Sequence, residues 1–332
     1  MKDWPAMAVP RSEDVPQRQQ DSASSLLTVL IAFAANLLIA AAKTVAAWIT
    51  GSASMTAEAA HSWADTGNQV FLMVAEKKSQ KGRDPTHPMG YGREAYVWSM
   101  FAAFGLFTAG AVVSIMHGIQ QLFEPEPAAD FAVAYIVLAI SFVLEGSSFL
   151  QAYRQARSSA ARYRRHTLEH VVLSSNPTLR AVFAEDSAAL IGILIAFAGI
   201  LLHELTGSAV PDAVGSILVG VLLGVIAVVL IDRNRRFLVG QSVTPEMRRL
   251  TARMLLQQPQ IERVTYLHME FVGPSRLYLV AAVDLVGNYS ERDVAVALRG
   301  IERRLEEDEM IEEAVFTLAT PDEPSLFRDE NV

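Results

Sequence analysis

The sequence predicts a membrane protein in which an all-α bundle of six transmembrane helices precedes a small cytoplasmic α+β domain. Hydrophobic residues make up 51% of the 332 residues and charged residues only 19%, whereas an average soluble domain carries about 25% charged residues. Apolar stretches of the roughly 20 residues that a bilayer span requires recur up to Asp232. Beyond Asp232 the chain is rich in Glu, Asp and Arg, as in a water-soluble domain.

Six segments before Asp232 are long and apolar enough to be spans, and together they define a transmembrane domain over 25–236. We expect them at approximately 25–49, 53–76, 95–119, 131–153, 178–203 and 211–232. The second is the least hydrophobic, and an amphipathic surface helix is the alternative for it. An even number of segments closes the topology and favours a span. The first 24 residues are polar and contain three prolines, which predicts a disordered cytoplasmic tail rather than a signal peptide.

The loops between these segments predict the orientation. Lys and Arg are concentrated in 77–94 and 154–177, while 50–52, 120–130 and 204–210 contain none. Because positively charged loops remain in the cytoplasm, both termini are expected there, as in a multi-pass protein of a bacterial-type plasma membrane.

Residues 243–320 have the pattern of a compact domain of order αββαβ, similar to a ferredoxin-like layer. Thr244 and Ser290 are suitable N-caps for two helices, and Gly273-Pro274 separates two runs rich in β-branched and apolar residues. The expected helices and strands are 245–257, 261–272, 277–286, 291–307 and 311–319. We expect the acidic tail over 321–332 to be frayed.

Ionisable residues inside two of the predicted spans indicate a metal site. His61 and Asp65 are four residues apart and therefore share one helix face, and Glu185 and Asp186 lie in the fifth span. Intramembrane carboxylates and imidazoles are costly and mark ion or proton pathways by default. With no cysteine in the chain, an imidazole with carboxylates suits zinc and also accepts cobalt, iron(II) or manganese.

Polar residues around this pair leave alternatives open. Counting outward from the turn at Gly51, Lys43 and Glu58 lie at about equal depth, so they form an ion pair or Glu58 acts as a ligand or relay. Asn36 lies at the depth of Asp65 and either supports the site from outside the ligand shell or forms an ordinary interhelical hydrogen bond.

The two carboxylates of the fifth span point about 100° apart. Only one of Glu185 and Asp186 therefore faces the pore squarely unless the helix bends. Glu185 is alternatively directed toward another helix, for example near Glu145 of the fourth segment, where two carboxylates would share a proton.

Local phrases carry a resemblance to a known family. Residues 50–65, Thr-Gly-Ser-Ala-Ser-Met-Thr-Ala-Glu-Ala-Ala-His-Ser-Trp-Ala-Asp, and residues 87–93, His-Pro-Met-Gly-Tyr-Gly-Arg, resemble segments flanking the second and third helices of the cation diffusion facilitator family. The similarity covers roughly 25–320. It implies a homodimeric antiporter that exports zinc or a similar divalent cation in exchange for protons. It also implies that the domain over 243–320 dimerises.

One position departs from the family pattern. Many members carry a second His- or Asp-x-x-x-Asp pair in the fifth helix, but this chain has Val182 where the first ligand would fall. The phrase Phe183-Ala-Glu-Asp-Ser-Ala-Ala-Leu190 resembles a subgroup that includes mitochondrial-type zinc transporters of eukaryotes. We therefore expect His61, Asp65, Asp186 and Glu185 as metal ligands, with Asn36, Glu58 and Glu145 as supporting or coupling residues.

Two function classes remain at this stage. The first is a secondary active transporter that exports divalent metal, with zinc favoured; the second is a membrane metal sensor or scaffold that signals through its cytoplasmic domain. An enzyme is not expected, because His203-Glu204 lacks the second histidine of a zinc-protease motif. The net charge of -8 argues against nucleic acid as a partner. No cofactor is expected besides the transported cation, and the expected partners are the metal ion, protons, the bilayer and a second copy of the chain.

Overall fold

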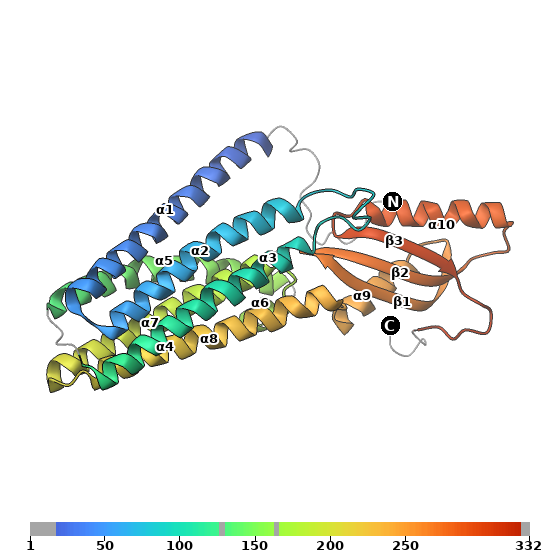
Figure 1. The fold of residues 1–332 in the computed structure, drawn as a ribbon. Helices are drawn as coiled ribbons and strands as arrows, with labels where there is room; N and C mark the ends of the chain where they lie inside the picture. Colours follow the sequence, from blue (N-terminus) through green and yellow to red (C-terminus); the bar gives the residue numbers. More distant parts are fainter. Residues whose placement is uncertain (1–17, 126–129, 163–165, 327–332) are drawn as a thin grey trace. The chain divides into compact units, whose positions relative to one another are not determined.

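The computed structural model describes residues 18–125, 130–162 and 166–326 (Figure 1). They fall into two compact units. One contains 18–77 and 95–235, and the other contains 78–94 and the chain from Arg236 onward. The loop over 78–94 thus groups with the C-terminal residues although it connects two helices of the first unit.

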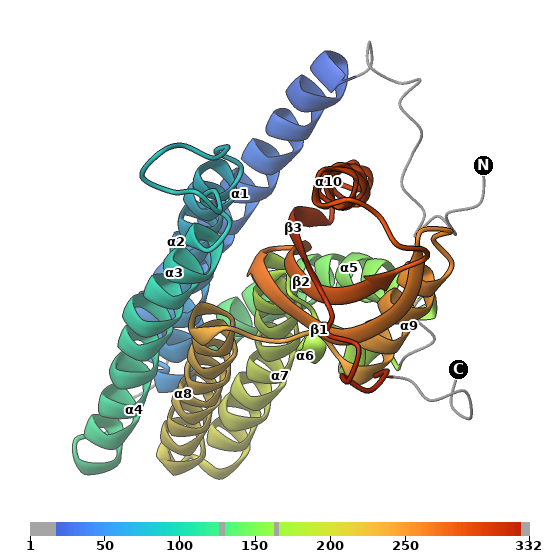
Figure 2. The same cartoon turned by 90° about the vertical axis from the view of Figure 1, so that its right-hand side faces the viewer.

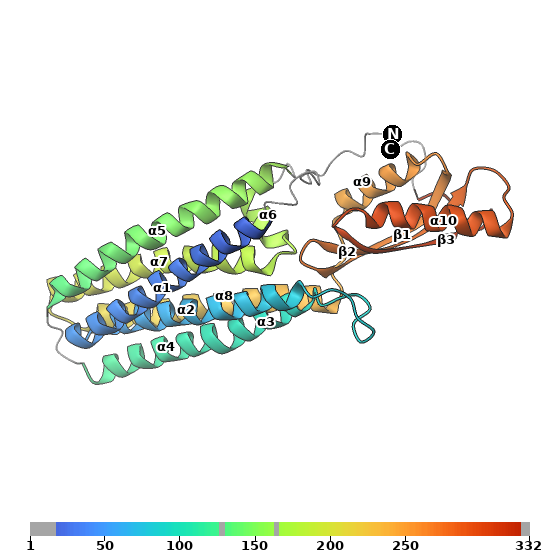
Figure 3. The same cartoon turned by 90° about the horizontal axis from the view of Figure 1, so that it is seen from above.

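The first unit is entirely helical, and its long helices run side by side (Figure 3). Its elements are α1 (Arg18–Thr50), α2 (Ala53–Ser79), α3 (Glu94–Ala102), the π-helix η1 (Ala103–Phe107), α4 (Thr108–Phe123), α5 (Phe131–Arg162), α6 (Thr167–Leu173), α7 (Pro177–Thr206) and α8 (Val210–Val239), the last of which continues into the second unit. Local signals fix several ends. Asn176 caps α7 by accepting hydrogen bonds from the backbone N–H groups of Thr178 and Leu179, and Gly51 adopts a φ of 62° in the turn between α1 and α2.

Five helical segments among the described residues are long and apolar enough to cross a membrane. They are Phe33–Thr50, Glu94–Phe123, Phe131–Ala161, Pro177–Thr206 and Val210–Val239. Helix α2 has 27 residues and is long enough, but its polar residues keep it outside this set. Large apolar side chains such as Trp48 and Val143 are exposed on the bundle, as a lipid-facing surface requires.

Some predicted boundaries are wrong. Helix α1 already begins at Arg18, so 18–24 are helical rather than part of a disordered tail. Arg154 and Arg157 lie on α5, which continues to Arg162, because arginine is a good helix former and nothing breaks the helix there. The remainder of the predicted tail, 1–17, lies outside the described residues, as do Arg164, Arg165 and 327–332.

The second unit confirms the predicted αββαβ order. Its elements are α9 (Pro245–Leu256), β1 (Ile261–Gly273), β2 (Arg276–Leu285), α10 (Glu291–Glu306) and β3 (Ile311–Leu318). The strands form one sheet of order β1-β2-β3, with β1 antiparallel and β3 parallel to β2. Leu255 of α9 and Ile301 of α10 share one core cluster with the strands, so both helices cover the same side of the curved sheet (Figure 2).

Candidate metal site in the helical unit

A polar face runs along the buried side of α2. Glu58, His61, Asp65 and Asn68 are spaced three and four residues apart, which places them on one face, and all four side chains are buried. His61 Nε2 lies 3.6 Å from Asp65 Oδ2. The imidazole and the carboxylate thus adjoin each other, as the sequence predicts for a pair at this spacing.

Several polar atoms on this face have no hydrogen-bond partner among the described residues. They are both ring nitrogens of His61, Oδ1 of Asp65 and Oε1 of Glu58. Buried polar atoms are normally hydrogen-bonded, and an unpaired one costs about 1–3 kcal/mol. Nitrogen and carboxylate oxygen are suitable donors for a divalent cation, so a cation bound here would satisfy atoms that the protein itself leaves unpaired.

The two carboxylates of α7 face different helices. Glu185 accepts a hydrogen bond from the side-chain amide of Asn68 on α2, whereas Asp186 Oδ2 accepts one from Ser148 Oγ of α5 at 2.9 Å. The angle between consecutive helix positions explains the division. Glu185 is therefore the residue of this pair that joins the α2 face.

Lys43 and Glu58 form a buried ion pair, with 2.9 Å between Lys43 Nζ and Glu58 Oε2. Glu145 Oε1 lies 3.7 Å from the same ammonium group. The predicted pairing of Lys43 with Glu58 is thus confirmed. Glu145 contacts Lys43, and the hydrogen bond of Glu185 crosses to Asn68 of α2; the pairing of Glu185 with Glu145 stays a prediction.

The expected ligands are not assembled around one point. Among the described residues, no three His, Asp or Glu side chains are arranged to hold a metal ion. His61 and Asp65 lie beside each other and would form half of the expected site, while the α7 carboxylates are bonded to Asn68 and Ser148. A site made of these four residues would require the α7 carboxylates and the α2 pair to move closer together. Asn36 lies on α1 and is only partly buried.

The sequence analysis missed a buried carboxylate that anchors the start of α2. Asp212 of α8 accepts hydrogen bonds from Ser52 Oγ at 2.9 Å, from the Ala53 N–H at 2.8 Å and from the Ser54 N–H at 3.2 Å. A carboxylate is favourable at a helix N-terminus, where the free N–H groups carry partial positive charge. The sequence signal was an aspartate two residues into an otherwise apolar span, opposite a turn with two serines.

A second polar cluster ties together α3, α7 and α8. Arg180 donates to Asn234 Oδ1 at 2.7 Å, and the Asn234 amide donates to Ser99 Oγ at 3.0 Å. All three side chains are buried. Arg180, a positively charged residue within the predicted fifth span, is the signal that would have found this cluster.

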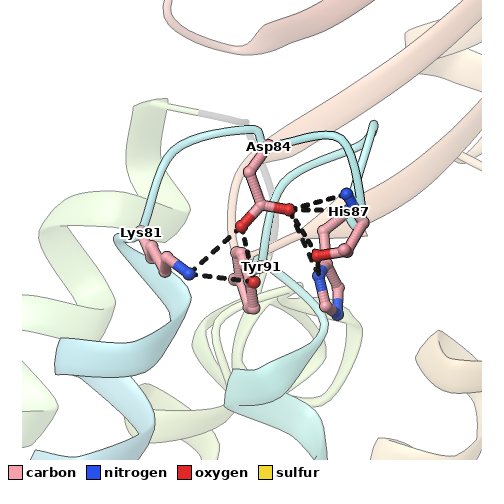
Figure 4. A network of polar contacts seen from close by, with 5 residues as sticks. Lys81, Asp84, His87 and Tyr91 are labelled. Carbon is pink, nitrogen blue, oxygen red and sulfur yellow. Dashed lines mark hydrogen bonds and ion pairs between the residues drawn. The ribbon is translucent and has the colours of Figure 1, made fainter.

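The loop between α2 and α3 contains another aspartate and histidine (Figure 4). Asp84 Oδ1 accepts from the backbone N–H and the hydroxyl of Thr86 at 2.9 and 2.6 Å, and Oδ2 accepts from the hydroxyl of Tyr91 at 2.7 Å and from Lys81 Nζ at 3.1 Å. His87 stacks on the Tyr91 ring. The hydrogen bonds from Thr86 and Tyr91 hold the pKa of Asp84 well below its usual range. Those from Lys81 to Tyr91 and Asp84 raise the pKa of Lys81.

This loop is fastened to the strands of its own unit. Arg83 Nε lies 2.7 Å from Glu312 Oε1, and Arg276 bonds the other oxygen of Glu312 at 2.8 Å. Gly92 adjoins the turn between β1 and β2, where a Cβ would lie 2.7 Å from the Val272 carbonyl oxygen. Arg93 pairs with Glu270.

The family follows from comparison with known proteins. The family model for the cation efflux transmembrane domain matches residues 29–239. The chain belongs to the cation efflux family, also called the cation diffusion facilitator family. This cation efflux protein is therefore a multi-pass membrane protein, in agreement with its apolar helices.

Curated relatives extend the similarity beyond the helical unit. The chain is 31% identical over 287 residues to metal tolerance protein C4 of Arabidopsis thaliana, which covers 85% of this chain and 63% of the relative. It is 34% and 33% identical over 282 residues to the mitochondrial proton-coupled zinc antiporters SLC30A9 of Mus musculus and Homo sapiens, which covers 85% of this chain and 48% of each relative. This cation efflux protein thus matches 63% of the length of the plant relative and about half of the length of the two antiporters.

Proposed function

We propose that this protein is a secondary active transporter that moves divalent metal cations, with zinc favoured, out of the cytoplasm in exchange for protons. The observation that carries the proposal is the buried His61–Asp65 pair with its unpaired donor atoms, adjacent to Glu185 through Asn68. The relatives named as proton-coupled zinc antiporters favour zinc and protons as the substrates.

Helix α2 is the sixth span in this proposal. At 27 residues it is about 40 Å long, more than the roughly 30 Å of a bilayer core. Six spans place both ends of the helical unit on one side, and the lysines and arginines of 77–94 make that side the cytoplasm. The αββαβ unit is then cytoplasmic, and we assign it the role of dimerisation. A bacterial-type plasma membrane remains our proposal for the location.

Four residues form the proposed ligand set: His61, Asp65, Glu185 and Asp186. The set has three carboxylates, two of which suffice to balance the charge of a dication, and its one imidazole favours zinc over harder ions. Glu58, Glu145 and Asn36 contribute charge and hydrogen bonds from outside this set.

Proton exchange follows from the same donors. Imidazole and carboxylate must be deprotonated to bind metal, so metal entry and proton departure are linked. Rocking of the helices around the site would expose it to each side in turn. Protons then displace the metal outside, and the metal displaces protons inside.

Flux measured in proteoliposomes tests this proposal. The vesicles contain a zinc-sensitive dye, and a pH gradient is imposed across their membrane. We expect zinc to accumulate inside against its concentration gradient while the pH gradient is dissipated. Saturable zinc binding without flux would favour the alternative of a metal sensor or scaffold. Competition with manganese, iron(II) and cobalt identifies the preferred ion.

A further inference from the structure

The ammonium group of Lys43 lies inside the helical bundle between two carboxylates. Its side chain is 0% exposed, as is that of Glu58, and the Glu145 side chain is 12% exposed. Lys43 Nζ lies 2.9 Å from Glu58 Oε2 and 3.7 Å from Glu145 Oε1. Lys43 lies on α1, Glu58 on α2 and Glu145 on α5, so three helices meet at one buried positive charge.

Both carboxylates adjoin the proposed metal donors. Glu58 precedes His61 by three residues on α2, and Glu145 precedes Ser148 by three residues on α5, so each is one turn away on the same face. Ser148 in turn bonds Asp186. The carboxylates around Lys43 are therefore the next acidic layer beyond the half-site.

This layer keeps spare capacity to bind a cation. Oε1 of Glu58 is buried and has no hydrogen-bond partner among the described residues. It approaches α7 at Gly192, where a Cβ would lie only 2.5 Å from it. The absence of a side chain at Gly192 gives this oxygen its space.

Charge explains why the ammonium group is needed. Two carboxylates facing each other in a bundle that crosses lipid cannot both stay ionised without a positive charge. Lysine supplies a compact, strongly hydrated charge on a flexible stem, which occupies the position that a free cation would otherwise take. Two carboxylates with no imidazole suit a hard divalent cation such as manganese.

We propose that Lys43 fills a second cation site formed by Glu58 and Glu145, and that it thereby limits the bundle to one divalent metal ion per chain. The inference rests on the proposed function for the neighbouring site that takes the cargo. It makes Lys43 a residue that determines how many ions the acidic cluster binds and of which kind.

Metal counting on the full-length protein in detergent tests the inference, with Mn²⁺ and Zn²⁺ as separate probes. Lys43→Met removes the charge and keeps most of the side-chain volume. We expect this variant to bind one more Mn²⁺ per chain than the wild type, as measured by equilibrium dialysis and by electron paramagnetic resonance of Mn²⁺. Lys43→Arg keeps a positive charge and should bind the wild-type number.

The double variant Lys43→Met/Glu58→Gln removes one carboxylate as well and should return to the wild-type number. Lys43→Gln, whose amide still donates to Glu58, serves if Lys43→Met does not fold. A folded Lys43→Met or Lys43→Gln that binds no additional Mn²⁺ would overturn the inference. The measured quantity is the number of Mn²⁺ ions bound by the variant minus the number bound by the wild type, and it does not depend on zinc flux. Absence of zinc flux in the wild type would overturn the proposed function and leave this inference standing.

Discussion

Two pairs, each of one aspartate and one histidine close together in sequence, have opposite surroundings in this chain. His61 and Asp65 lie on buried helix α2, and both ring nitrogens and one carboxylate oxygen lack hydrogen-bond partners among the described residues. Asp84 and His87 lie in the loop before α3, where the carboxylate accepts hydrogen bonds at both oxygens (Figure 4).

Under the proposed function, this difference separates a metal-binding pair from a structural pair. A buried polar atom without a hydrogen-bond partner raises the free energy of the metal-free protein, and a cation that binds to this atom removes that cost. The Asp84 carboxylate already has five hydrogen-bond donors in the loop, so it orders the loop. Residue identity and spacing alone do not distinguish the two pairs; the partners do.

The largest expected effect separates the two pairs directly. Asp65→Asn removes a negative charge that balances the dication, and we expect zinc flux in proteoliposomes to fall to the background rate. Asp84→Asn is the matched control and should retain flux within about twofold. Equal loss of flux in both variants would show that the comparison is wrong.

The next effect concerns which α7 carboxylate joins the α2 half-site. Glu185→Ala removes the carboxylate that contacts Asn68, and we expect zinc affinity to fall about tenfold, which corresponds to about 1.4 kcal/mol. Val182→His places an imidazole one turn before Asp186 and should restore most of that affinity in the double variant. Unchanged affinity and flux in Glu185→Ala would leave Asp186 acting with α2 alone.

A smaller effect is expected where the loop is fastened to its unit. Glu312 is mostly buried and accepts hydrogen bonds from Arg83 and Arg276. Glu312→Gln keeps the shape but removes the charge, and we expect a loss of about 1 kcal/mol in local stability. Faster amide hydrogen exchange over 83–93 measures it. Glu313→Gln is the control, since Glu313 lies farther from Arg83, at 3.6 Å, than Glu312 does at 2.7 Å. It should change the exchange rate less.

The smallest effect is a pH dependence confined to the loop. The folded loop lowers the pKa of Asp84, so its contribution to stability is complete above the ordinary aspartate pKa of about 3.9 and is lost as the pH falls further. Pepsin should therefore cut within 81–91 increasingly between about pH 4 and pH 2. In Asp84→Asn the cutting should already be present at pH 4 and change little, and the same pH response in wild type and variant would contradict the assignment to Asp84.

Much of this protein follows from local sequence. Apolar stretches predict the spans, and the alternation and caps around Thr244 and Ser290 predict the αββαβ unit, because hydrophobic periodicity and capping act over a few residues. The spacing of His61 and Asp65 predicts their shared face, since helix geometry alone fixes it. Equal depth on two consecutive helices predicts the contact of Lys43 with Glu58.

The tertiary structure decided the contacts that depend on how helices rotate about their axes. Glu185 faces Asn68 and Asp186 faces Ser148 because α7 packs between α2 and α5 in one particular rotation, which side-chain packing along whole helices determines. Asp212 reaches the start of α2 for the same reason, across about 160 residues of chain. The choice between Glu185 and Asp186 could not come from spacing, because adjacent residues on a helix always point about 100° apart and only the neighbours reveal which one faces the site.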